Sequence, residues 1–307
     1  MNSTGFPILD LPRFGPDQTV IPTEAEAAEY CRSLTQKHYE NFSVATFLLP
    51  RDMREHFYAV YAYCRWADDL GDESADALHL LDWWETLLDG FYADSTTAIH
   101  PVFIALNKTI REFGIPKQPF ADLLVAFRQD QVVKEYETRD DLLHYCRHSA
   151  NPVGRIILHL ARTTDAESLR LSDAVCTGLQ LANFWQDVAR DWDEKGRIYL
   201  PREDRLRFGV TDTMFRERRA TPEFRALLAE ETDWAESFFR TGAALPSRLN
   251  KTFSRDVRLF SAGGLAILAV IRRQNYDVWT RRPSLSKWQK FCLLLRCLAG
   301  FLPFGRV

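Results

Sequence analysis

The spacing of apolar residues constrains the fold of this chain more than any other feature. Along most of the 307 residues they recur every three to four positions, and convincing alternation at every second position is absent. This period matches one face of an α-helix, because residues i, i+3, i+4 and i+7 lie on the same side. Turn-forming stretches separate the periodic segments, as in "FGIP" at 113–116 and "TTDAE" at 163–167. The sequence therefore predicts an all-α protein.

The periodic segments also predict the domain organisation. Helices are expected over 23–37, 52–73, 75–92, 97–113, 117–133, 138–162, 168–193, 222–241, 254–281 and 285–300. No low-complexity linker or fixed repeat separates them, so a single domain is expected over 23–284. Residues 1–22 contain four prolines and are expected to form an extended N-terminal arm.

The segment 285–307 combines apolar and basic residues. It is too short and too interrupted for a spanning helix of roughly 20 residues. Two interpretations stay open. The segment is either a helix lying on an anionic membrane surface or a last core helix that caps the bundle. Its cations are Lys287, Lys290, Arg296 and Arg306.

Charge and cysteine content narrow the class of protein. The formal net charge is −3 and the pI about 6.2, so no overall basic field recruits nucleic acid. The six cysteines are scattered, without a CxxC pair or zinc-finger spacing. We expect a reduced chain in the cytoplasm, either free or peripheral on the inner face of the cytoplasmic membrane.

Two pairs of aspartates stand one helical turn apart in apolar, aromatic surroundings. Asp68 and Asp72 belong to "YAYCRWADDLGDE", and Asp187 and Asp191 to "NFWQDVARD". A single pair of this kind is usually a solvated surface. If the two pairs face each other across a cavity, however, their repulsion in a medium drier than water is costly. Mg²⁺ relieves it by binding carboxylates and substrate phosphates, so we predict a diphosphate ligand with an apolar remainder.

These motifs resemble the squalene/phytoene synthase family of head-to-head prenyl synthases. The matching segments are "AVYAYCRWADDLGDE" and "TGLQLANFWQDVARDWDEKGRIYLP", supported by "HYENFSVATFLLPRDMR", "LHYCRHSANPVG" and "NYDVWTRR". Together they cover roughly residues 29–282. The resemblance implies a single-domain helical bundle of the isoprenoid-synthase type, with a central cavity and the two aspartate-rich motifs facing each other.

The resemblance also implies a role for each matching residue. Binding of Mg²⁺ and, through it, of the diphosphate falls to Asp68, Asp72, Asp187 and Asp191. Catalytic contacts with the diphosphate fall to Tyr61 and Arg65, and a late phosphate contact falls to Arg281. The remaining substrate-binding residues are His38, Tyr39, Glu40, Asn41, Tyr145, Gln180, Asn183 and Gln186.

Two departures from the family pattern bear on the reaction. Several members carry a cation immediately before the second acidic motif, where this chain has Gln186. Carotenoid-type members carry Ser and Lys after the first histidine, where this chain has Tyr39, Glu40 and Asn41. We interpret both as lost cations at a site that handles one diphosphate. They favour a bacterial subgroup of hopanoid precursor synthesis, whose members convert presqualene diphosphate and water into hydroxysqualene and diphosphate.

Alternatives remain beside this hypothesis. Within the family, the rival activity is condensation of two prenyl diphosphates to squalene, dehydrosqualene or phytoene. Outside enzymes, the fold also occurs in non-catalytic assembly factors, but all four aspartates of the acidic motifs are intact here.

Water capture needs a residue that places the water, and Glu40 or Tyr39 is our candidate. The alternative is that Glu40 is a surface acid at a helix start. The expected partners are the prenyl diphosphate, the membrane surface, and the enzymes before and after it in the pathway.

Overall fold

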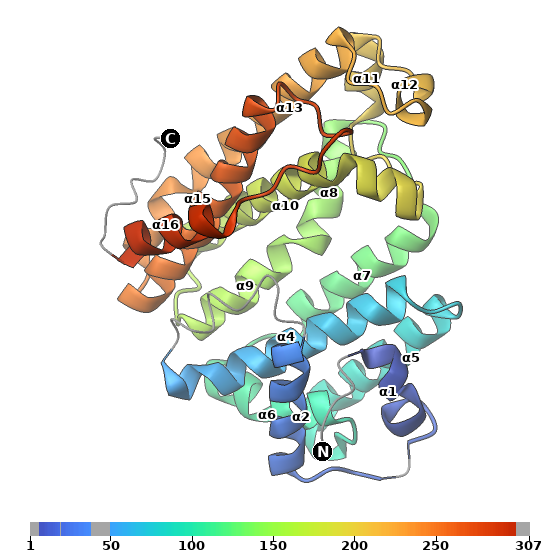
Figure 1. Cartoon of the computed structure of the whole chain (residues 1–307). Helices are drawn as coiled ribbons and strands as arrows, with labels where there is room; N and C mark the ends of the chain where they lie inside the picture. Colours follow the sequence, from blue (N-terminus) through green and yellow to red (C-terminus); the bar gives the residue numbers. More distant parts are fainter. Residues whose placement is uncertain (1–5, 19, 38–49, 299–307) are drawn as a thin grey trace. The chain divides into compact units, whose positions relative to one another are not determined.

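The chain folds into helices throughout its described part. Figure 1 shows the computed structural model, which describes residues 6–18, 20–37 and 50–298. Within these ranges every regular element is a helix, and there is one isolated bridge, between Glu135 and Ile198. The predicted all-α class is therefore confirmed. The helices belong to two compact units, 1–132 and 133–307, while the expected limits at residues 22 and 284 stay predictions.

The first unit is built around one long helix. It contains α1 (Pro7–Phe14), α2 (Glu24–Lys37), α4 (Arg51–Asp72), α5 (Ala77–Ala93), η1 (Ser95–Thr97), α6 (Pro101–Phe113) and α7 (Gln118–Val132). Helix α4 lies at its centre, packed against α2, α5, α6 and α7. Trp66 of α4 stacks on Trp84 of α5, with ring centroids 5.4 Å apart. Its indole Nε1 donates a 3.0 Å hydrogen bond to the hydroxyl of Tyr30 in α2. These buried contacts fix which side of α4 carries the first acidic motif.

The expected extended arm is wrong over Pro7–Phe14, which forms α1. Proline suits the first turn of a helix, where its missing N–H has no partner to lose, and Pro7 occupies that position. The helix is held by burial of Phe14, whose ring packs edge-on against Tyr30 at 4.9 Å. The Tyr30 hydroxyl also donates a 2.8 Å hydrogen bond to the buried Asp10 carboxylate. Tertiary contacts therefore override the extended tendency of a proline-rich stretch.

The second unit is built around α10. It contains α8 (Arg139–Ser149), α9 (Asn151–Leu160), α10 (Ala166–Lys195), α11 (Arg202–Phe208), α12 (Asp212–Arg216), α13 (Pro222–Thr241), η2 (Gly242–Ala244), α14 (Leu245–Arg248), α15 (Lys251–Arg273) and α16 (Lys287–Leu298). Helix α10 packs along α9, α13 and α15. Asp165 caps its start by accepting the Ser168 N–H, and Gly196 ends it with a φ of 60°, which glycine adopts without strain.

Two expected helices are shorter than their apolar pattern predicts. The segment 138–162 is two helices that meet at Ala150, because Pro152 has no N–H to donate to the carbonyl of His148 and its ring would clash with that carbonyl in a continuous helix. The helix expected over 254–281 ends at Arg273, after which Asn275 and Tyr276 adopt φ values of 51° and 58°. These left-handed residues turn the chain back along the second unit. Helix α13, by contrast, has the predicted bounds, with Thr221 accepting the Phe224 N–H at its start.

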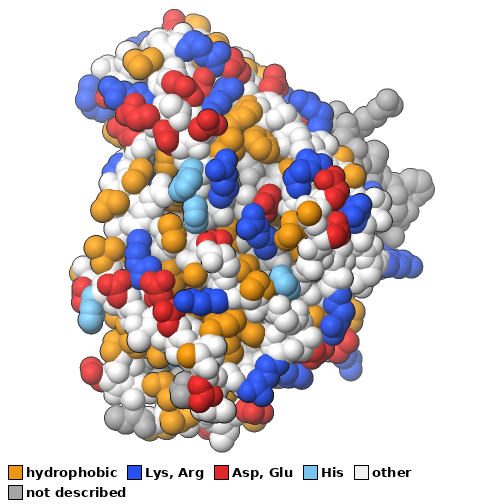
Figure 2. Space-filling view, turned by 180° about the vertical axis from the view of Figure 1, so that it is seen from behind, with side chains coloured by type: hydrophobic (Ala, Val, Ile, Leu, Met, Phe, Trp, Pro, Cys, Tyr) orange, Lys and Arg blue, Asp and Glu red, His pale blue; other side chains and the backbone are white. Residues whose placement is uncertain are grey.

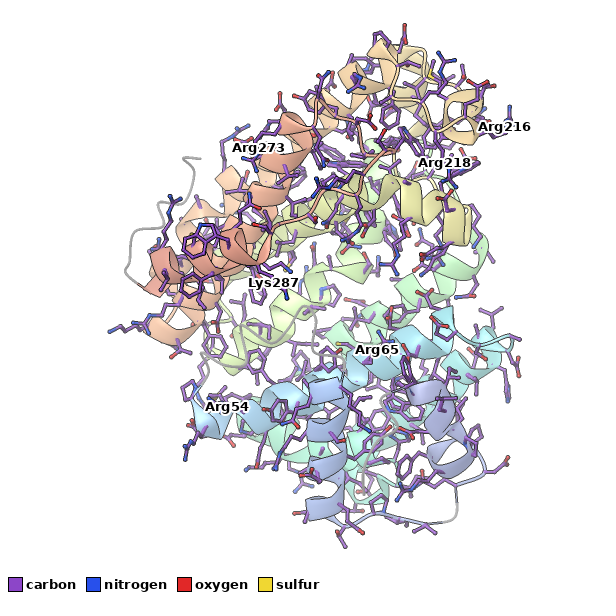
Figure 3. The ribbon with its side chains drawn as sticks, in the orientation of Figure 1. Arg54, Arg65, Arg216, Arg218, Arg273 and Lys287 are labelled. Atoms are coloured by element: carbon purple, nitrogen blue, oxygen red, sulfur yellow. The ribbon has the colours of Figure 1, made fainter. Side chains whose placement is uncertain are left out.

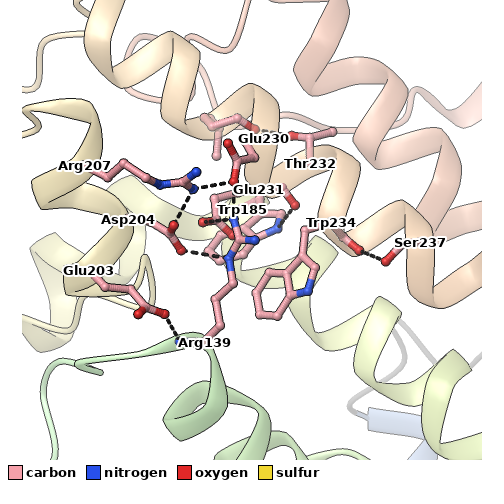
Figure 4. Close-up of polar contacts among 11 residues, drawn as sticks. Arg139, Trp185, Glu203, Asp204, Arg207, Glu230, Glu231, Thr232, Trp234 and Ser237 are labelled. Carbon is pink, nitrogen blue, oxygen red and sulfur yellow. Dashed lines mark hydrogen bonds and ion pairs between the residues drawn. The ribbon is translucent and has the colours of Figure 1, made fainter.

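A charged network joins four helices of the second unit (Figure 4). Arg139 of α8 donates to Asp204 of α11 at 2.8 Å and to Glu231 of α13 at 3.2 Å. Burial raises the pKa of Glu231 to about 8, although the guanidinium of Arg139 opposes this. The backbone carbonyl of Glu231 accepts a 3.0 Å hydrogen bond from Nε1 of Trp185. The network therefore anchors α10 two residues before Asp187.

No helix in the described ranges has the length and apolar character that crossing a bilayer requires. All six cysteines keep free thiols. Figure 2 shows acidic and basic side chains interspersed on the visible face.

Adjacent glycines in α15 offer a matched test of packing. A Cβ on Gly264 would lie 2.5 Å from Cζ of the buried Phe239, whereas a Cβ on Gly263 would meet no atom within 4 Å. We expect Gly264→Ala to lower the free energy of unfolding by about 1–3 kcal/mol through overpacking. Gly263→Ala should raise it by up to about 1 kcal/mol, because alanine favours the helix. Urea denaturation followed by circular dichroism measures both, and equal effects would contradict the packing described.

The buried Glu231 predicts a pH dependence of stability. Its pKa is about 8 in the folded protein and near 4.5 when unfolded, so the native state binds the extra proton between these values. Stability contributed by this group is therefore lost as the pH rises, by on the order of 2–4 kcal/mol from roughly pH 5 to pH 8. Glu231→Gln should flatten that slope in denaturation curves. Glu230→Gln is the control, because the pKa of Glu230 is lowered and it titrates below this window; an unchanged slope in Glu231→Gln would contradict the assignment.

Candidate functional site

The first acidic motif lies on α4 with an arginine tied beside it. Asp68 is half-buried and Asp72 exposed, one turn apart as predicted. Arg65, labelled in Figure 3, places Nη2 2.5 Å from Oδ1 of the buried Asp69, and Nη1 3.7 Å from Oδ2 of Asp68. Burial raises the pKa of Asp69 to about 7, with Arg65 opposing the shift. Asp69 thus holds the guanidinium, a positioning role that the sequence analysis did not assign.

Tyr61 stands one turn before Arg65 on the same helix. Its side chain is half-buried, and this burial raises the pKa of the phenol to about 12. The hydroxyl therefore keeps its proton at neutral pH and can donate a hydrogen bond to an anion. Tyr61, Arg65 and Asp68 follow one another at helical spacing, so α4 presents a neutral donor, a cation and a carboxylate in sequence.

The second acidic motif lies on α10 and is the more buried of the two. Asp187 is 7% exposed, and its Oδ2 accepts a 3.0 Å hydrogen bond from Nδ2 of Asn183. Asp191 follows one turn later, and burial together with the charge of Asp187 raises its pKa to about 7. Gln180 is half-buried one turn before Asn183. Four predicted site residues therefore share this face of α10.

Arg282 neutralises Asp187 from a segment 95 residues later. Its Nε donates to Oδ1 of Asp187, and its Nη2 donates to Oδ2 at 3.0 Å. Beside this pair, Nε2 of Gln186 donates a 2.6 Å hydrogen bond to the carbonyl of Pro283. The expected role of Gln186 in substrate binding stays a prediction. Gln186 holds the chain next to Arg282, which supplies a cation to the second motif.

The segment that carries Arg282 is fixed to α12 and α13. The carboxylate of Asp277 accepts the backbone N–H groups of Trp279 and Thr280 at 3.1 and 3.0 Å. Trp279 is buried against Phe215 and Phe224, with ring centroids 5.4 Å apart in each case. These contacts hold the backbone so that the side chain of Arg282 reaches α10. In the sequence, the only signal was the pair of adjacent arginines, which does not say which one points inward.

Arg281, the arginine singled out from the resemblance, is exposed and has no ion-pair partner among the described residues. Its expected contact with a phosphate stays a prediction. His38, Tyr39, Glu40 and Asn41 lie outside the described residues, so their expected roles also stay predictions.

Aromatic rings flank the second motif within the second unit. Tyr199, in the segment after α10, stacks on Phe184 at 3.8 Å with an interplanar angle of 7°. Tyr145 of α8 is buried with its ring 6.1 Å from Phe184 and 5.4 Å from Tyr136. The N–H of Ile198 donates to the carbonyl of Lys134 at 2.8 Å, which fixes the segment in place. The expected contact of Tyr145 with substrate stays a prediction.

The carboxylates match the chemistry of Mg²⁺. The described residues contain no group of three or more histidines, cysteines, aspartates or glutamates placed to hold a metal. Mg²⁺, however, commonly takes one or two carboxylates and completes its shell with waters and phosphate oxygens. Asp187 and Asp191 offer oxygen ligands only, and burial together with the charge of Asp187 raises the pKa of Asp191, so a cation beside it would favour its ionised form. The residues therefore fit the predicted ion.

Comparison with known proteins identifies relatives over nearly the whole chain. The family model described as squalene/phytoene synthase matches residues 35–289. The 15-cis-phytoene synthase of Synechocystis sp. is 31% identical over 306 residues, covering 94% of this chain and 89% of that protein. The hydroxysqualene synthase of Rhodopseudomonas palustris is 38% identical over 183 residues, covering 58% of this chain and 60% of that protein.

A solved structure agrees with these matches. The crystal structure of squalene synthase HpnC from Alicyclobacillus acidocaldarius is 46% identical to the chain, with a TM-score of 0.79. The match covers 83% of this chain and 96% of that chain.

The adjacent arginines 281 and 282 predict unequal effects on stability. Arg282→Ala leaves the buried Asp187 carboxylate without its cation, at a cost discounted because the side chain of Arg282 is 49% exposed. We expect the free energy of unfolding without divalent cations to fall by about 1–2 kcal/mol. Arg281→Ala is the matched control and should change it by less than about 0.5 kcal/mol. Chemical denaturation at neutral pH measures both, and a larger loss in Arg281→Ala would refute the assignment.

Proposed function

Because the chain belongs to the squalene/phytoene synthase family, whose members are prenyltransferase-type terpenoid synthases acting on prenyl diphosphates, we propose that it converts presqualene diphosphate and water into hydroxysqualene and diphosphate. The observation that carries this choice is the pattern of similarity. Identity is 46% to a squalene synthase and 38% to a hydroxysqualene synthase, against 31% to a phytoene synthase over a longer alignment.

The proposed reaction is balanced without an oxidant or a reductant. The bond between carbon and the diphosphate oxygen breaks, and both electrons leave with the diphosphate. The cyclopropylcarbinyl cation rearranges, water attacks it through oxygen, and one proton is released. The protein must therefore stabilise negative charge on the leaving group and restrict water around the cation to one productive molecule.

The two acidic motifs carry the first task in this proposal. Asp68, Asp72, Asp187 and Asp191 would hold Mg²⁺, which as a Lewis acid takes up charge on the diphosphate. Arg65, held by Asp69, offers its guanidinium to phosphate oxygens, and the protonated Tyr61 offers a hydrogen bond. Arg282 adds positive charge at Asp187, and Gln186 keeps it there through Pro283. Arg281, Gln180 and Asn183 remain proposed substrate contacts.

The aromatic cluster of Tyr136, Tyr145, Phe184 and Tyr199 serves the second task. These rings are buried, Phe184 and Tyr199 are stacked, and the cluster would present an apolar wall that keeps bulk water from the cation. Placement of the single attacking water is proposed for Glu40 or Tyr39, with His38 and Asn41 as further contacts of that segment. Glu40→Ala should then change the ratio of hydroxysqualene to other products.

Condensation of two prenyl diphosphates is the second candidate function. It is favoured by the long match to a phytoene synthase and by Arg282, which restores a cation where Gln186 had suggested a loss. The proposed cellular location is the same for both reactions. We place the enzyme in the cytoplasm, alone or peripheral on the membrane, next to the enzymes that supply its substrate and consume its product.

Separate incubations distinguish the two reactions. Purified protein with Mg²⁺ and presqualene diphosphate should form hydroxysqualene, and farnesyl diphosphate alone should give no product by mass spectrometry. A C30 or C40 hydrocarbon from simple prenyl diphosphates would establish condensation instead.

The same assay tests the acidic face. Asp187→Asn should lower kcat/KM at least about 100-fold, because it removes a carboxylate that would hold the Mg²⁺ facing the leaving diphosphate. Asp193→Asn is the control, since Asp193 lies on α10 but pairs with Arg218 at 2.7 Å. Similar activity in both variants would contradict the role of Asp187.

A further inference from the structure

Helix α16 has one covered face and one uncovered face. It packs on α15, and its Cys297 is buried there, where the thiol donates to the backbone carbonyl of Arg255 at 3.4 Å. Residues on one face of a helix recur every three to four positions. The buried position of Cys297 therefore fixes which residues of α16 lie on the opposite, outer face. The contacts therefore settle which side of α16 is turned outward.

The outer face of α16 is a stripe of large apolar side chains. Trp288, Phe291 and Leu295 are 70%, 47% and 48% exposed, and their spacing of three and four places them in one row. The rings of Trp288 and Phe291 lie together, with centroids 5.6 Å apart. Scattered apolar residues are normal on a protein surface, whereas a contiguous row with an aromatic at its head marks an interaction site.

Positive charge surrounds this stripe. From 280 to 298 the chain has five cations and neither aspartate nor glutamate, although its overall formal charge is −3. One of the five, Arg282, is paired with Asp187. Lys287, labelled in Figure 3, stands one turn before Phe291, and Arg296 follows Leu295 on the other edge of the stripe. Lys287, Lys290 and Arg296 form no ion pair with any described residue. Their charges are therefore available to an external anionic partner.

A second exposed apolar group, at the N-terminus, lacks this charge. Phe6, Leu9, Val20 and Ile21 are also exposed, but the stretch 6–21 contains two aspartates and one arginine. Apolar surface alone is thus found in both units. The combination of an aromatic row with unbalanced cations distinguishes α16.

We propose that the outer face of α16 docks on an anionic lipid bilayer. The apolar row enters the boundary between headgroups and acyl chains, and the flanking cations contact lipid phosphates while their stems lie along the surface. A second protein fits less well. Even fully buried aromatic side chains contribute about 150–250 Å² each, so this half-exposed row falls short of the ~800 Å² per partner typical of stable complexes. This inference is independent of which family reaction the chain catalyses.

Vesicle co-sedimentation of the full chain tests the proposal. We expect binding to phosphatidylcholine vesicles containing about one third phosphatidylglycerol, and much weaker binding to phosphatidylcholine alone or at high salt. The triple variant Lys287→Gln/Lys290→Gln/Arg296→Gln should lose about fivefold in partition coefficient per charge, or about a hundredfold in total. The triple variant Trp288→Gln/Phe291→Gln/Leu295→Gln should abolish insertion and leave only the salt-sensitive part.

Controls separate this surface from general effects of charge and hydrophobicity. Lys108→Gln/Lys117→Gln/Arg170→Gln removes the same charge from three other surface positions, and Leu206→Gln removes another exposed apolar side chain. Both should bind vesicles like the wild type, and all variants should keep the wild-type circular dichroism. Absence of wild-type binding, or equal binding by the α16 variants, overturns the proposal. Loss of an oligomer in the apolar variant, without any change in lipid binding, assigns the face to a second copy and also overturns it.

Discussion

A carboxylate buried within an apolar helix needs a cation, and this requirement at Asp187 organises the second unit. The free energy of an ionised group away from water is unfavourable unless opposite charge and hydrogen bonds replace the lost solvation. Asn183 supplies one hydrogen bond from the preceding turn, and Arg282 supplies two from a distant segment. The segment from Gln274 to Pro283 places the side chain of Arg282 against Asp187.

The surrounding packing serves this arrangement. Trp185 and Gln186 precede Asp187 directly, and their side chains reach in different directions from α10. The indole of Trp185 is tied to α13 through the carbonyl of Glu231, whereas Gln186 is tied to Pro283. Rotation of α10 about its axis would break both hydrogen bonds. The residues next to the acidic motif therefore fix the direction in which its carboxylates point.

The two acidic motifs differ in where the arginine that pairs with their carboxylates comes from. On α4 the arginine is local, because Arg65 lies one turn from Asp69 and pairs with it on the same helix. On α10 the cation comes from far along the chain. Helical spacing could predict the first pair, because Arg65 and Asp69 stand four residues apart on one helix. It could not predict the second, because a contact across 95 residues depends on the path of the chain between them.

The sequence by itself determined the all-α class, the bounds of α13, the two aspartate pairs on single helix faces and the family motifs. These features are local, since helical periodicity and capping act within a few residues. The tertiary structure decided the end of α15 at Arg273, the helix in the proline-rich N-terminal stretch and the outer face of α16. It also decided that Arg282, rather than Arg281, pairs with Asp187, and that Gln186 anchors Pro283. Adjacent residues with the same side chain have the same local preferences, so only the backbone that carries them, here turned at Asn275 and Tyr276, sets which one faces the helix.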